Sequence, residues 1–271
     1  MNTFKIFTLV LLSTIISITL ISCSFPKTRH YSSSVVQYLY PNKKPIETPK
    51  IPALSLPLRV GIAFVPSRNR NFTERDKIDL MREISKHFNQ YNFVKSIEII
   101  PSAYLTPKGS FANLDQISTM YDIDVISLIS YDQTRFTDSS LASITYWTLV
   151  GAYIVPGEKN DTHTMVDAAV YDIKSKKMLF RSPGISHIKS RATLVNLSEQ
   201  VRIDSTEGFK LASQELVLNL TEQLRLFQDK VKEAPQDYKI IHKPNYQGGG
   251  GSVDIYFLLM LLVGIILYKK Y

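Results

Sequence analysis

The sequence contains a single cysteine, Cys23, among 271 residues. An intrachain disulfide is therefore excluded, and so are a cysteine-ligated metal cluster and a cysteine nucleophile. The sequence also lacks a glycine-rich phosphate-binding loop and the Gly-x-Ser-x-Gly turn of many hydrolases. We therefore expect no bound cofactor and no enzymatic activity of these common classes.

Histidine is scarce and scattered, with five residues in the chain. No two of them have the four-residue helical spacing that zinc-binding helices use. The sequence accordingly predicts no metal site, and His87 reads as an ordinary helix residue. The five are His30, His87, His163, His187 and His242.

The N-terminus carries one cation, Lys5, followed by an uncharged apolar run over 6–21. This arrangement is typical of a secretory signal peptide, here residues 1–22. The residues directly before Cys23 resemble a bacterial lipobox, which implies that Cys23 receives S-diacylglycerol and N-acyl chains and becomes the first mature residue. The alternative is a plain signal peptide with an incidental cysteine. The lipobox-like residues are Leu20, Ile21 and Ser22.

Export and charge limit the partners. Ser24 is not the aspartate that resembles an inner-membrane retention signal, so we expect the protein at the outer membrane or cell surface. The formal net charge is +8, which favours contact with anionic lipid. Nucleic acid is not expected, because the cations are dispersed without interleaved aromatic residues.

The C-terminus has three parts. A glycine run is followed by an apolar segment, 255–268, which is shorter than the ~20 residues of a full membrane span. Two terminal lysines would hold the end of this segment on the cytoplasmic side. The glycine run and the lysines are Gly248, Gly249, Gly250, Gly251 and Ser252, and Lys269 and Lys270.

This tail resembles the GlyGly-CTERM sorting signal. The resemblance implies that the tail is cut by a rhombosortase, a rhomboid-type intramembrane protease whose substrate this chain would be. The alternative is a permanent C-terminal membrane anchor attached through a linker. In either case the folded part would lie outside the cytoplasm.

The remaining chain divides into a proline-rich, partly ordered tether at 23–57, a globular domain at 58–234 and a linker at 235–252, before the tail at 253–271. The first half of the domain predicts a strand over 58–65, a helix capped by Thr73, a strand over 94–100, a short helix around Leu114 and a strand over 124–131.

The second half of the domain is rich in β-branched and aromatic residues. Segments 143–155 and 162–173 predict an antiparallel hairpin joined by a turn over 156–161. A third strand over 177–191 is expected to break at Pro183 and Gly184. A long helix follows, starting at a capping box of Asn196 and Glu199 and ending near Pro235. Its apolar stripe is Phe209, Ala212, Leu216, Leu220, Leu224, Phe227 and Val231.

The order β-α-β-α-β-β-β-α predicts an α/β single domain with a mixed, largely antiparallel sheet and helices mainly on one face. It looks like small domains of curli-secretion, peptidoglycan-synthase-activating and TolB-type lipoproteins, by analogy only. Four stretches carry a closer resemblance over nearly the full length, to the rhombotarget lipoprotein family. That family implies a processing route but no molecular activity. The stretches are 111–117, 130–133, 146–153 and 166–173.

Two candidate sites stand out inside the domain. Asp124 and Asp132, with Asp122 nearby, could serve an envelope hydrolase, although capping of a helix end and of a loop is the favoured explanation. The loop 157–162 with His163 could be a polar binding tip or an ordinary hairpin turn. Aromatic residues cluster in the strands, where we expect core packing: Tyr131, Tyr146, Trp147, Tyr153 and Tyr171.

The favoured interpretation is a lipid-anchored envelope lipoprotein that acts by binding or scaffolding. Its expected partners are membrane lipid, the lipoprotein-processing enzymes, the rhomboid-type protease and an envelope protein. The alternatives are an activator of a cell-wall or secretion machine, and a hydrolase using Asp124 and Asp132.

Overall fold

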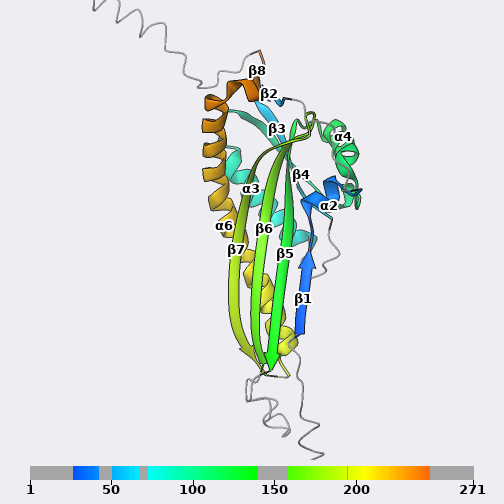
Figure 1. The fold of residues 1–271 in the computed structure, drawn as a ribbon, viewed down its shortest axis with the longest axis vertical. Helices are drawn as coiled ribbons and strands as arrows, with labels where there is room; N and C mark the ends of the chain where they lie inside the picture. Colours follow the sequence, from blue (N-terminus) through cyan, green and yellow to red (C-terminus); the bar gives the residue numbers. More distant parts are fainter. Residues whose placement is uncertain (1–26, 43–50, 67–72, 140–157, 194, 245–271) are drawn as a thin grey trace, which may run out of the picture.

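A computed structural model of the chain describes residues 27–42, 51–66, 73–139, 158–193 and 195–244. These residues form a mixed α/β domain with a mostly antiparallel sheet, as the sequence predicts (Figure 1). The helices are α2 (Val35–Leu39), α3 (Glu74–Phe88), α4 (Ser110–Tyr121) and α6 (Leu197–Glu233), with short 3-10 turns at Ser102–Tyr104 and Pro235–Asp237.

The main sheet has the order β4-β3-β5-β6-β7. Strand β3 pairs in parallel with both β4 and β5, whereas β5, β6 and β7 form an antiparallel meander. β1 pairs with the part of β5 that continues beyond β3. The strands are β1 (Lys27–Ser32), β3 (Leu58–Phe64), β4 (Val94–Ile100), β5 (Val125–Ser139), β6 (Glu158–Asp172) and β7 (Lys177–Ala192).

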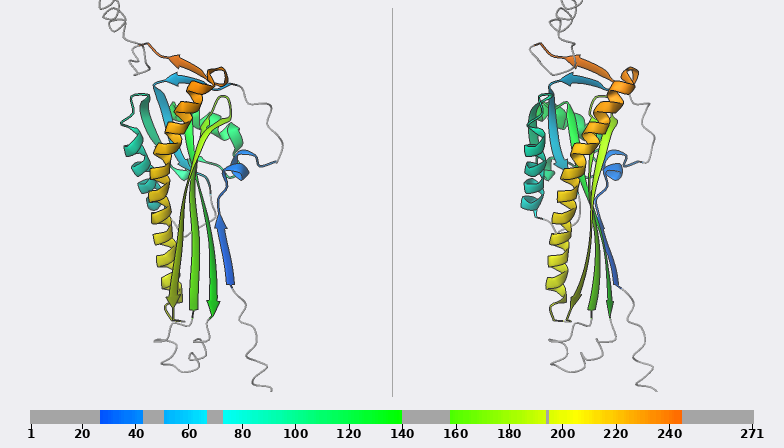
Figure 2. Two further views of the ribbon diagram at one scale, coloured as in Figure 1. Left: turned by 60° about the vertical axis from the view of Figure 1, so that its left-hand side comes forward. Right: turned by 90° about the vertical axis from the view of Figure 1, so that its left-hand side faces the viewer.

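Helices cover both faces of the sheet, which differs from the one-faced arrangement that we expected. Helices α3 and α6 pack on the face that carries Ile62 and Ile129. Helices α2 and α4 pack on the opposite face, over Ala63 and Leu128 (Figure 2). The difference arises because successive side chains of β3 and β5 are buried alternately on the two faces, so both faces need cover.

The expected starts of α3 and α6 are both confirmed, but the capping box expected at Asn196 is not present. The Thr73 hydroxyl accepts from the Asp76 backbone N–H while Asp76 accepts from that of Thr73, which is a capping box. Asn196 makes no such contact with the helix. Its side-chain oxygen instead accepts from Thr193, so the amide closes the preceding turn.

The expected hairpin is wrong in its strand partner and in the start of its second strand. The partner of β6 is β5, and β6 begins at Glu158, inside the segment read as a turn. The misleading residues are polar yet buried: Glu158, Asn160 and Thr162 alternate with outward-facing neighbours. Segment 143–155, the expected first strand, lies outside the described residues, as do Tyr146, Trp147 and Tyr153.

Strand β7 runs through Pro183 and Gly184 without the expected break. Because β7 is an edge strand, the missing N–H of Pro183 costs the sheet no ladder hydrogen bond. Elements of the fold also lie outside the predicted 58–234 domain. β1, α2 and β2 (Ala53–Leu56) precede it, and β8 (Lys239–His242) follows it and pairs in parallel with β2.

Candidate functional site

The domain contains an apolar pocket of about 460 Å³. This volume lies within the ~300–1,000 Å³ typical of small-molecule sites. Its floor is the sheet face beneath α3 and α6, and β2 and β8 close one end. The residues that line the pocket include Leu58, Val60 and Ser127 on the sheet, Ile84 and Phe88 on α3, Leu220, Leu224 and Phe227 on α6, and Ile240 and His242 on β8.

The pocket lies between α3 and α6 over β3 and its neighbouring strands. Leu58 and Val60 are only partly buried, although β3 lies between β4 and β5. The sequence places large apolar side chains around the gap, at helical spacing on α3 and α6 and at every second position of β3. The lining is therefore suited to hydrocarbon.

Few polar groups line this pocket. They are Ser127, Gln228, Lys232 and His242, and no described carboxylate is among the lining residues. Only 5% of Ser127 is exposed, and its hydroxyl has no hydrogen-bond partner among the described residues. Buried hydroxyl groups are almost always hydrogen-bonded. The Ser127 hydroxyl is therefore available to a polar atom inside the pocket.

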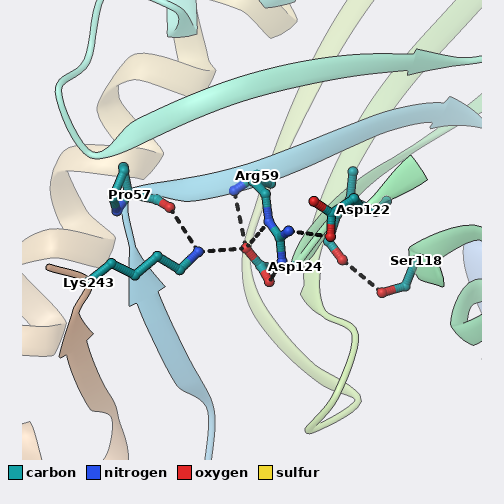
Figure 3. A network of polar contacts seen from close by, with 7 residues as sticks. Pro57, Arg59, Ser118, Asp122, Asp124 and Lys243 are labelled. Carbon is teal, nitrogen blue, oxygen red and sulfur yellow. Dashed lines mark hydrogen bonds and ion pairs between the residues drawn. The ribbon is translucent and has the colours of Figure 1, made fainter. Parts of the chain in front are cut away.

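An ion-pair network lies beside the closed end of the pocket (Figure 3). Arg59 on β3 donates to Asp124, from Nη2 to Oδ1 at 2.7 Å and from Nε to Oδ2 at 3.0 Å, and also contacts Asp122. Lys243, which follows β8, lies 3.6 Å from Asp124 and donates to the carbonyl of Pro57. The network therefore ties the β2–β8 sheet to the start of β3 and β5.

The electrostatics agree with a structural role for Asp124. Burial raises the pKa of Asp124, but the hydrogen bond from Arg59 and the charges of Lys243 and Arg59 outweigh it, so the net pKa is lowered. The hydrogen bond to Asp124 is the largest cause of the raised pKa of Arg59. Asp124 thus stays ionised, which is unfavourable for a general acid.

The carboxylates of the hydrolase alternative do not converge. Asp124 and Asp132 are eight residues apart along the same extended segment, which at about 3.3 Å per residue separates them by about 26 Å. Asp132 has its own partner, because its two oxygens lie 2.9 and 3.0 Å from His30 Nε2. A two-carboxylate site built from this pair is contradicted.

The histidines are less scattered in space than in sequence. His163 and His187 face each other across β6 and β7 and share Asp161, which corrects the expectation that no histidines come together. The expected binding tip at 157–162 is largely strand. His87 is an exposed residue of α3, as expected, and His242 lines the pocket. The two-residue spacing of Asp161 and His163 was a usable signal, and the partner strand 177–191 was predicted, but the register that sets His187 opposite His163 was not.

Tyr131 and Tyr171 are buried in the core, which confirms packing as their role. The lipobox, Cys23, the glycine run and the terminal lysines lie outside the described residues. Within the described part of the chain, no helix is both long and apolar enough to cross a membrane.

In sequence, the chain matches no protein-family model and no curated protein. Among solved structures, it is similar to a neuraminyllactose-binding hemagglutinin homologue from Helicobacter pylori. The two chains are 10% identical, and the match covers 72% of this chain and 97% of that one with a TM-score of 0.35.

Proposed function

We propose that the protein is an exported, lipid-anchored envelope protein that binds a fatty acyl chain with an anionic head group in the pocket between α3 and α6. The observation that carries this proposal is the 460 Å³ pocket, which has an almost wholly apolar lining. Removing one methylene group from water contributes about 0.8 kcal/mol, so a hydrocarbon chain is the natural occupant of such a lining.

The polar residues of the pocket support the choice of head group. Lys232 supplies a positive charge, and no described carboxylate of the lining would repel an anion. The unpaired Ser127 hydroxyl offers a hydrogen bond deeper inside. A neutral hydrocarbon would leave both groups unused.

The two ends of the chain supply the envelope setting of the proposal. Cys23 carries the acyl anchor, and the glycine run at 248–251 marks the region where a rhomboid-type protease removes the tail. Mass spectrometry of the membrane-extracted protein tests both ends together. An unmodified Cys23 with the leader attached contradicts the lipid anchor, and an intact 255–271 segment contradicts processing of the tail.

Ligand binding is tested separately, with the delipidated mature protein and a fluorescent fatty-acid analogue. Val60→Phe places a phenyl ring in the pocket and should weaken binding about tenfold or more, equivalent to excluding two methylene groups. Leu218→Phe is the matched control, because Leu218 lies on the exposed side of α6. Absence of saturable binding by the unmodified protein, or equal affinity in Val60→Phe, contradicts the pocket's role.

A further inference from the structure

A second cluster of interacting side chains lies on the sheet face opposite α6, whereas the pocket lies on the face that α3 and α6 cover. Asp161 and His163 are two residues apart on β6, so both point to the same face. His187 stands directly opposite His163 on β7. The lower half of β5, β6 and β7 in Figure 1 has α6 behind it, and no described helix covers its other face.

The donor atoms of these three residues converge. Asp161 Oδ1 lies 3.0 Å from His163 Nε2 and 2.5 Å from His187 Nε2. The two imidazole rings are stacked, with centroids 4.0 Å apart and planes 16° apart. All three ligand atoms fall within 4.8 Å of one another. Donors bound to one tetrahedral zinc ion at about 2.0–2.1 Å are about 3.3 Å apart, which lies within the spread of these three atoms. The two stacked rings would have to tilt toward each other so that both Nε2 lone pairs point at the ion.

From this convergence we infer that Asp161 Oδ1, His163 Nε2 and His187 Nε2 form a binding site for a divalent first-row transition metal of the zinc class. Two imidazoles and one carboxylate are a ligand set that zinc and its neighbours favour, whereas magnesium and calcium prefer oxygen ligands. The face is open, so the remaining coordination positions would be filled by water.

The backbone holds these ligands more firmly than their exposure suggests. Asp161 and His163 stand on β6, the central strand of the meander, and the register of β6 and β7 places the two histidines as a cross-strand pair. Phe136 of β5 packs edge-on against the His163 ring, with centroids 6.2 Å apart. The site is therefore largely formed before the metal arrives.

One nearby cation must be considered. Lys189 is the cross-strand partner of Asp161 and would repel a metal ion if its ammonium group stayed close. Lys189 is exposed, and its flexible four-carbon stem allows the charge to move into solvent. The same face offers an internal comparison, because His30 also contacts a carboxylate, Asp132, but its cross-strand partner is Thr134 rather than a histidine.

The test is zinc titration calorimetry on the chelator-treated mature protein without a histidine tag, with cobalt absorption as a second readout. The unmodified protein should bind one zinc ion per chain. His163→Ala and His187→Ala should each weaken binding at least about tenfold, as loss of a ligand costs more than the 10–100-fold loss seen for outer-shell partners. The cobalt spectrum should lose its d–d bands in the same variants.

His30→Ala is the matched control and should bind zinc like the unmodified protein. These exposed positions should leave the fold intact, which melting of the metal-free variants checks. The proposal is overturned by an unmodified protein that binds no zinc, by equal zinc affinity in the His163→Ala, His187→Ala double variant, or by a preference for magnesium over zinc.

Discussion

The two halves of α6 meet the sheet in opposite ways. Its C-terminal half presents Leu220, Leu224 and Phe227, large side chains that stand over the pocket. Apart from Phe209, its N-terminal half buries mainly small side chains, among them Ser205 and Gly208. One helix therefore borders both a cavity and a close-packed contact.

Contacts in the N-terminal half are close enough to involve the backbone. A Cβ atom added at Gly184 of β7 would lie 2.0 Å from the carbonyl oxygen of Ala212 and 2.4 Å from the amide nitrogen of Leu216. Across the same contact, the Ser186 hydroxyl donates to the carbonyl of Gly208 at 2.7 Å. Glycine and serine thus bring the helix against the strand.

The comparison shows that side-chain size along α6 sets where volume is left. Small residues draw the helix backbone onto the sheet, and their polar groups find partners there. Large apolar residues of the C-terminal half line the cavity that is left between α3, α6 and the sheet.

Replacing a leucine of α6 by alanine should lower the free energy of unfolding more at the close contact than beside the pocket. Leu216 is completely buried, so Leu216→Ala should lower the free energy of unfolding by about 4 kcal/mol. Leu224 already borders a cavity, so Leu224→Ala should cost only about 2 kcal/mol. Urea denaturation measures both, and equal costs would contradict the difference in packing.

Adding one methyl group at the close contact should also be damaging. Gly184→Ala forces the new Cβ atom against the backbone of α6, which we expect to cost about 3 kcal/mol. Ile185→Ala is the control, because the Ile185 side chain is 58% exposed and its loss should change stability little. A Gly184→Ala protein as stable as the original would mean that α6 moves away freely.

The same packing explains how much of the fold the sequence predicted. Elements with apolar periodicity, such as α3, β3 and the stripe of α6, were predicted nearly to their ends. The start of β6 was misread as a turn because Glu158 and Asn160 are polar although they are buried. Alternation of hydrophobicity is absent where both faces of a strand are polar.

The candidate sites were less accessible to sequence reasoning. The pocket depends on the spacing between α3 and α6, which no local pattern encodes. The Asp161, His163 and His187 cluster depends on the register of β6 and β7, which lie on either side of a short turn. Asp124 was singled out as a candidate catalytic carboxylate, and its ion pair was not predicted because its partner Arg59 is 65 residues away in sequence.

At the closed end of the pocket, charge rather than close packing secures the structure. Because the folded pKa of Asp124 lies below its unfolded value, the ion pair stabilises the protein above the unfolded pKa and is lost as the pH falls through the folded pKa. Asp124→Asn should therefore cost about 1 kcal/mol at neutral pH, a low figure because solvent reaches the pair. The cost should shrink progressively below a pH of about 4. A cost that is independent of pH would contradict the ion-pair origin.

The smallest effects are expected at two serines, Ser186 at the close contact with α6 and Ser127 in the pocket. Ser186→Ala removes a hydrogen bond to Gly208 and should cost about 1 kcal/mol. Ser127→Ala removes a buried hydroxyl that has no partner among the described residues, so the stability of the unliganded protein should be unchanged or slightly higher.

Urea denaturation with and without a bound fatty acid distinguishes the roles of the two serines. If Ser127 serves the head group, Ser127→Ala should lose part of the stabilisation that the fatty acid confers, because ligand binding stabilises in proportion to affinity. Ser186→Ala should keep that stabilisation in full, because the Ser186 hydroxyl donates to the Gly208 carbonyl of α6 and does not line the pocket. If Ser186→Ala lost the stabilisation and Ser127→Ala kept it, the head group would be recognised outside the pocket.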